Sequence, residues 1–125
     1  MVREFVRTPN APQPAGPYTQ AIKAGSFVFV AAQGPVDPKT GKMGDTVEIQ
    51  TRQTLLNVKA ILEAAGANMA DVVKVSVFLK DASTFSKMNE VYKTFFPQNP
   101  PTRTTIEAKF AGSMLVEIDA VAYRD

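Results

Sequence analysis

The segment Ser26–Gln33 (SFVFVAAQ) restricts the fold most, because apolar side chains occupy both its odd and its even positions. Successive side chains of a strand point to opposite faces of the sheet, and Gly25 and Gly34 bound the segment. It therefore predicts a strand that is apolar on both faces, which needs cover on both sides.

The rest of the chain alternates between strand and helix patterns. In chain order, the other expected elements are a strand at Glu4–Arg7, a proline-rich loop at Pro9–Pro17, a helix at about Thr46–Ala65, a strand at Val72–Lys80, a helix at about Thr84–Phe96, and strands at Thr102–Phe110 and Met114–Tyr123. Asp45 is the expected N-cap of the first helix, with Glu48 at the capping-box spacing and Gly66 just beyond the helix end. The core face of the second helix is expected to carry Phe85, Met88, Tyr92 and Phe95 or Phe96. This order predicts one α+β domain over residues 1–125, with two helices on one face of a mixed sheet.

Two absences narrow the chemistry, because the chain has neither histidine nor cysteine. Thiolate nucleophiles, histidine bases and nearly all zinc, haem or iron–sulfur sites are excluded. Catalysis would use arginine, lysine, carboxylates, tyrosine, hydroxyls, backbone dipoles and water, and an oxygen-ligated magnesium or calcium site stays open.

The charge and hydropathy of the chain argue against nucleic acid and membranes as binding partners. Fourteen basic and twelve acidic residues are interleaved along the chain, with no cluster of Lys and Arg that would favour nucleic acid. No apolar run reaches the roughly 18 residues of a transmembrane helix, and the N-terminus lacks the pattern of a signal peptide. We expect a cytoplasmic protein that does not enter a membrane.

The last two predicted strands are expected to form a hairpin through residues 111–113. In that register Ile106 lies opposite Ile118, Glu107 lies opposite Glu117, and Arg103 shares the face of the two carboxylates. One interpretation is a solvated sheet face of mixed charge. The other is that a second copy covers this face, which places the charged residues at or beside a subunit interface, where half-buried charges are typical of functional sites.

Nine segments carry a resemblance to a known family. They are residues 10–12 (NAP), 16–21 (GPYTQA), 33–41 (QGPVDPKTG), 52–55 (RQTL), 57–66 (NVKAILEAAG), 77–81 (VFLKD), 88–92 (MNEVY), 101–107 (PTRTTIE) and 116–122 (VEIDAVA). In this order and at this spacing they resemble the reactive-intermediate deaminase (Rid/YjgF) family over nearly the whole chain. Only the Ala108–Met114 connection is short.

The resemblance implies a chorismate-mutase-like fold and a homotrimer with clefts between neighbouring subunits. It also implies the activity of a 2-iminobutanoate/2-iminopropanoate deaminase. Such an enzyme hydrolyses imino acids that arise from 2-aminoacrylate or 2-aminocrotonate, and it releases a 2-keto acid and ammonia. No cofactor or metal is implied.

The same resemblance assigns roles to residues. Arg103 would bind the substrate carboxylate, and Glu117 would orient and deprotonate the attacking water. The backbone of Thr105 would hold the imine or the carboxylate, and Tyr18 would close the pocket. Further family pocket positions are Asn89 and the backbone near Ala32.

Departures from the family pattern keep other functions open. Ala31-Ala32-Gln33 stands where Ser-Gly-Gln is common, Thr105 where cysteine is frequent, and Gly34 where a branched apolar residue is usual. The alternative function is a trimeric module that binds keto acids or another protein without turnover. RNA cleavage is less favoured, because no basic stripe or exposed stacking aromatic residues support it.

Overall fold

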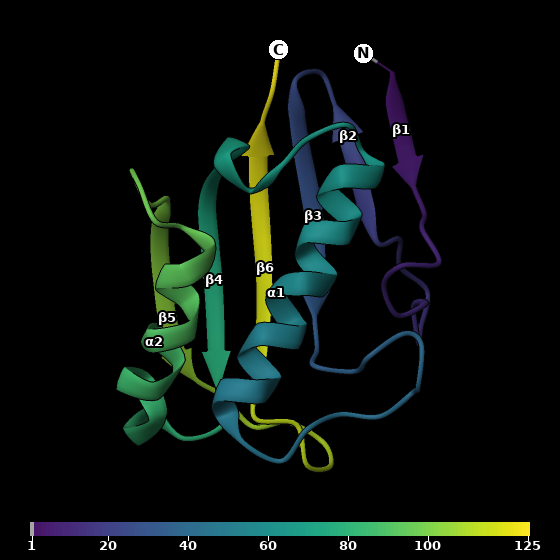
Figure 1. Cartoon of the computed structure of the whole chain (residues 1–125). Helices are drawn as coiled ribbons and strands as arrows, with labels where there is room; N and C mark the ends of the chain where they lie inside the picture. The colour runs from purple at the N-terminus through teal and green to yellow at the C-terminus, as the bar shows by residue number, and fades with distance from the viewer. Residues whose placement is uncertain (1) are drawn as a thin grey trace.

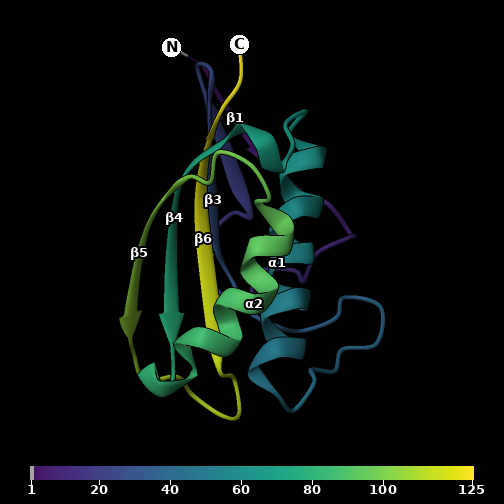
Figure 2. The same cartoon turned by 60° about the vertical axis from the view of Figure 1, so that its left-hand side comes forward.

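Six strands form one mixed sheet, and two helices pack on one of its faces, in the computed structural model that describes residues 2–125 (Figures 1 and 2). The elements are β1 (Arg3–Val6), β2 (Ala21–Ala24), β3 (Phe27–Gln33), α1 (Val47–Ala64), the 3₁₀ turn η1 (Met69–Asp71), β4 (Val72–Leu79), the 3₁₀ turn η2 (Ala82–Thr84), α2 (Phe85–Phe95), β5 (Thr102–Glu107) and β6 (Val116–Tyr123). The predicted α+β class with two helices on one face is confirmed. None of the helices in this part of the chain is long and apolar enough to cross a membrane.

The order of the strands is β1-β2-β3-β6-β4-β5; β4 and β5 run parallel, and the other neighbouring pairs of the described strands run antiparallel. The predicted hairpin between the last two strands is therefore wrong, because β4 lies between β5 and β6. A parallel pair needs a crossover connection, and α2 supplies it between β4 and β5. Residues 108–115 then carry the chain past the end of β4 into β6, where Lys80 N donates to Leu115 O.

The register of the strands also shows that, contrary to the prediction, Arg103 and Glu117 do not share a face of the sheet. Val75 of β4 is aligned with Arg103 on one side and with Ala120 on the other, whereas Phe78 is aligned with Ile106 and Glu117. Aligned residues share a face, and Val75 and Ala120 are buried under the helices. Arg103 thus lies on the helix-covered face and Glu117 on the opposite face.

Glu107 does not lie opposite Glu117, and Ile106 does not lie opposite Ile118. Glu107 is aligned with Leu79 at the end of β5, where its Oε2 accepts a hydrogen bond from Ala82 N at 2.8 Å. This carboxylate therefore binds the first amide of the turn η2, whose N-cap is Asp81, rather than meeting a second carboxylate.

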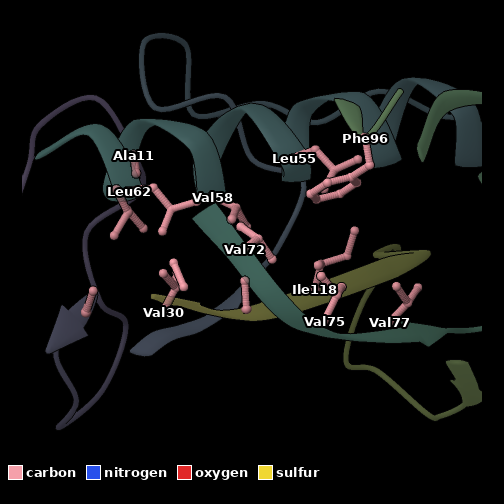
Figure 3. Close-up of a cluster of buried hydrophobic side chains, with 14 of the residues drawn as sticks. Ala11, Val30, Leu55, Val58, Leu62, Val72, Val75, Val77, Phe96 and Ile118 are labelled. Atoms are coloured by element: carbon pink, nitrogen blue, oxygen red, sulfur yellow. The ribbon is translucent and has the colours of Figure 1, made fainter. Parts of the chain in front are cut away.

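The core lies between α1, α2 and the sheet (Figure 3). Leu55, Val58 and Leu62 of α1 point toward the sheet, where Leu62 lies over Val30 and Leu55 lies on the side of Ile118; all are almost fully buried. These helix positions repeat every three or four residues, so they share one face of α1.

The predicted end of α1 at Gly66 is confirmed, but the predicted N-cap is wrong. Thr46, not Asp45, is the N-cap, and its Oγ1 accepts from Ile49 N at 3.2 Å. Gly66 follows the helix with a φ of 84°, the left-handed conformation expected just beyond a helix end.

Within the described residues, both helices lie on one face of the sheet and none covers the second face (Figure 2). Val28 and Val30 of β3 point into the core, whereas Phe27 and Phe29 are 42% and 47% exposed on the other side. Tyr123 packs edge-on against Phe27, with ring centroids 5.0 Å apart. The prediction that β3 is apolar on both faces is confirmed, and one chain covers only one of them.

Candidate functional site

Arg103 is held by three residues of α2. Its guanidinium carbon lies 4.6 Å from the ring centroid of Tyr92 and 5.3 Å from that of Phe85. Its Nη1 donates to Asn89 Oδ1 at 2.8 Å. Positions 85, 89 and 92 are four and three residues apart, so they share one face of the helix, directly over β5.

No carboxylate of residues 2–125 neutralises the charge of Arg103. None of the ion pairs in the described part of the chain includes Arg103. Aromatic faces and an amide oxygen orient a guanidinium without cancelling its charge, so this group is available to an anion.

A cavity of about 360 Å³ lies beside the guanidinium. Its walls come from the C-terminal half of α2 and the segment that leads to β5: Asn89, Tyr92, Lys93, Phe96, Pro100, Pro101 and Arg103. Most of this lining is apolar, and Arg103 supplies a full charge at its edge.

Two buried hydroxyls near Arg103 meet no hydrogen-bond acceptor within residues 2–125. Thr105 follows two residues along β5 on the same face, and its Oγ1 is buried and unpaired among the described residues. Tyr92 Oη is also buried without an acceptor, although the Arg103 side chain lies within hydrogen-bonding reach of it. Burial raises the pKa of Tyr92, and the neighbouring Arg103 partly opposes the rise, so the phenol stays protonated near neutral pH and can donate.

A second group of expected site residues lies around the ends of β3 and β6. Glu117 is half-buried on the face without helices, where burial, followed by the repulsion from Asp119, raises the pKa of its carboxyl. Asp119 Oδ1 accepts from Ser76 N at 3.2 Å. Ala32 is exposed in a bulge of β3 between Val30 and Gln33, beside this stretch of β6.

Tyr18 is joined to this second group by the proline-rich loop. The buried Gln20 organises the loop, since its side chain accepts from Thr8 N at 2.7 Å and donates to Pro12 O at 2.9 Å. Ala31 N donates to Gln20 O at 2.9 Å, which ties the end of the loop to β3. Tyr18 itself is half-exposed, and its hydroxyl accepts from Ala15 N at 3.3 Å.

One chain therefore holds two separate groups of the expected residues. It brings Arg103, Asn89 and Thr105 together at β5, an edge strand. It leaves Tyr18, Ala32 and Glu117 on the other side of β4, and Glu117 on the opposite face of the sheet.

Sequence reasoning missed the contact of Phe85 and Tyr92 with Arg103. Both were expected in the core, yet Phe85 is 43% exposed. Their spacing from Asn89 on one helix face was the available signal. Among residues 2–125, no three Asp, Glu, His or Cys side chains gather closely enough to hold a metal ion.

The fold and the arginine cluster define an α+β domain built around a mixed sheet, with an uncompensated cation at its edge. The chain belongs to the endoribonuclease L-PSP (YjgF/Rid) family, whose sequence profile matches residues 8–124. The predicted family resemblance is thereby confirmed.

Curated relatives match almost end to end. The chain is 52% identical to a RutC family protein of Pyrococcus horikoshii, over 99% of this chain and all of the relative. It is 44% identical to the 2-iminobutanoate/2-iminopropanoate deaminase of Salmonella typhimurium, over 95% of this chain and 96% of the relative.

Solved structures confirm the fold. The YjgF gene product of Escherichia coli is 40% identical with a TM-score of 0.92, over 98% of this chain and 99% of the other. Escherichia coli TdcF with bound serine is also 40% identical, with a TM-score of 0.94 over the same shares.

Proposed function

We propose that the protein is a 2-imino acid deaminase, which hydrolyses 2-iminopropanoate or 2-iminobutanoate to the 2-keto acid and ammonia in the cytoplasm. The observation that carries the proposal is Arg103, an oriented guanidinium beside a cavity that pairs with no carboxylate in the described part of the chain. Relatives named as such deaminases, at 42–44% identity, support the same reaction.

Arg103 binds the carboxylate of the substrate with two parallel N–H donors, a geometry that fixes the plane of the adjacent imine. The imine carbon is already electrophilic, so the protein needs to position a water more than to activate the carbon. Thr105 lies beside the guanidinium, where its backbone holds the imine or the carboxylate.

Glu117 orients the water and accepts its proton as the oxygen adds to C2 of the imine. The proton passes to the nitrogen and gives a carbinolamine. Its hydroxyl proton then moves to the nitrogen as the C–N bond breaks, so that ammonia leaves and the keto group forms. Water is the only co-reactant, and no electrons are transferred.

A substrate that contacts both Arg103 and Glu117 needs residues from two chains, because one chain places them on opposite faces of its sheet. We therefore place the site between subunits of a homotrimer. Tyr18 on its proline-rich loop closes the cleft, and Asn89 and the backbone near Ala32 line it.

The decisive experiment measures ammonia and pyruvate release from freshly generated 2-aminoacrylate, with and without the protein. We expect release well above the spontaneous rate. An unchanged rate would contradict the deaminase proposal.

The second candidate function, keto-acid binding without turnover, is favoured by Ala32, which stands where glycine is common in the family. Calorimetry with pyruvate separates the two functions. Binding through Arg103 without any acceleration of imine hydrolysis would support the binding module.

A further inference from the structure

Tyr92 carries a polar atom that core packing does not explain. The residue is only 6% exposed on α2, and its ring packs against Phe96 with centroids 4.8 Å apart. Its hydroxyl is buried and meets no hydrogen-bond acceptor among the described residues, and the nearby Arg103 side chain can only donate to it. A phenylalanine would fill the same space without a buried unpaired hydroxyl, so the oxygen calls for another explanation.

The surroundings of the hydroxyl point to an anion. The ring of Tyr92 lies against the guanidinium of Arg103, at 4.6 Å, and both residues line the same cavity. Arg103 is engaged by Asn89 through Nη1 alone, and no carboxylate pairs with it in residues 2–125. A neutral phenol beside an unpaired cation is a donor without an acceptor, and a bound carboxylate supplies that acceptor.

We propose that Tyr92 is a second carboxylate-recognition residue of the site, its ring holding the guanidinium of Arg103 and its hydroxyl donating to an oxygen of the bound carboxylate. This inference rests on the proposed function, because the carboxylate is that of the imino acid or of its keto-acid product.

Two variants separate the two parts of the side chain. Tyr92→Phe keeps the ring and removes the hydroxyl, whereas Tyr92→Leu removes both. Phe95→Leu is the matched control, since Phe95 is an aromatic residue of the same helix that faces another arginine, Arg52, at 6.0 Å. Binding of pyruvate and of the uncharged pyruvamide is measured by calorimetry, together with thermal unfolding and imine hydrolysis.

We expect Tyr92→Phe to weaken pyruvate binding about tenfold while its melting temperature stays equal or rises, because an unpaired buried hydroxyl is removed. Pyruvamide binding should change little. Tyr92→Leu should weaken pyruvate binding by about a further tenfold, since the guanidinium loses its aromatic support. Phe95→Leu should lower the melting temperature without this loss of binding.

The outcomes distinguish this inference from the proposed function. Imine hydrolysis by the wild type with unchanged pyruvate binding in Tyr92→Phe would overturn the role of Tyr92 and leave the deaminase intact. Weaker pyruvate binding in Tyr92→Phe, in a wild type that does not accelerate hydrolysis, would overturn the deaminase and support Tyr92. Equal losses of binding in Tyr92→Leu and Phe95→Leu would reduce the ring to a structural role and overturn that part of the proposal.

Discussion

Arginine at position 103 has a geometry that lysine cannot reproduce. Its planar fork can rest on Tyr92, donate to Asn89 and still present donors to a ligand. A lysine ammonium at the same place is a point charge on a flexible stem. It can attract a carboxylate but cannot hold it in one plane.

We therefore expect Arg103→Lys to lower kcat/KM for imine hydrolysis by about ten- to hundredfold, the equivalent of roughly 1.5–3 kcal/mol for a charge-assisted contact. Steady-state kinetics on freshly generated 2-aminoacrylate measures the loss. Arg52→Lys, which alters an arginine near Phe95 of α2, should leave kcat/KM unchanged. Wild-type kinetics in Arg103→Lys would remove this residue from the site.

Glu117 links pH to stability with a definite sign. Burial, and then Asp119, raises the pKa of its carboxyl in the folded chain, so the ionised form is less favourable folded than unfolded. The resulting loss of stability is absent below the unfolded pKa and grows as pH rises through the folded pKa. Glu117→Gln should thus melt at a higher temperature than the wild type at pH 7, and the difference should vanish in acid.

Although Glu117→Gln should be more stable than the wild type at pH 7, its activity should be lower. Glutamine can still orient a water but cannot accept its proton, so turnover should fall while pyruvate binding stays largely intact. The acid limb of the kcat/KM profile should lie above the ordinary range of a glutamate and be lost in Glu117→Gln. A variant that keeps both full turnover and the acid limb would exclude Glu117 as the base.

At the scale of elements, the start of α1 gives a direct test of one local contact. The Thr46 hydroxyl accepts from Ile49 N, whereas Asp45 lies one residue outside the cap. Thr46→Ala should therefore reduce the free energy of unfolding by about 1 kcal/mol, and Asp45→Ala by less than about half of that. Urea denaturation measures both, and a larger loss in Asp45→Ala would assign the cap to that residue.

Local pattern was enough to predict most of the elements. The 3.6-residue period predicted α1 and α2, and the alternation in Val72–Leu79 and Val116–Tyr123 predicted β4 and β6. These signals depend on neighbours in sequence. They say which face of an element is apolar, but not which strand lies beside which.

The predicted pairing of the last two strands was wrong because local patterns do not show which strands are neighbours. A short connection at Ala108–Met114 is compatible with a hairpin, but β4 can pair on both sides and takes the place between β5 and β6. The parallel pairing of β5 with β4 places Arg103 on the helix-covered face. The hairpin assumed from the sequence placed it on the face of Glu117 instead. Tyr92 was assigned to the core for a related reason: an aromatic residue on the apolar stripe of a helix gives no sign that it also touches a cation.

At the scale of the whole molecule, the sheet face without helices remains to be explained. Phe5, Phe27, Phe29, Ile106 and Tyr123 are all more than 40% exposed, and all of these strand positions belong to that face. Large apolar patches of this kind mark interfaces. In the proposed trimer a Glu117 would meet a neighbouring Arg103, so the proposal predicts that activity depends on subunit contact.

We predict that native mass spectrometry at micromolar concentration shows three chains of 13.6 kDa. Phe29→Lys should shift this mass to the monomer, because a lysine at the centre of β3 places a charge where the copies meet. The chain should still fold, since Phe29 points away from the core.

Leu56→Lys, at a comparably exposed apolar site on the outer side of α1, should leave the trimer intact. Imine hydrolysis should disappear with the trimer in Phe29→Lys and persist in Leu56→Lys. A wild-type monomer, or a fully active monomeric Phe29→Lys, would contradict both the assembly and a site shared between subunits.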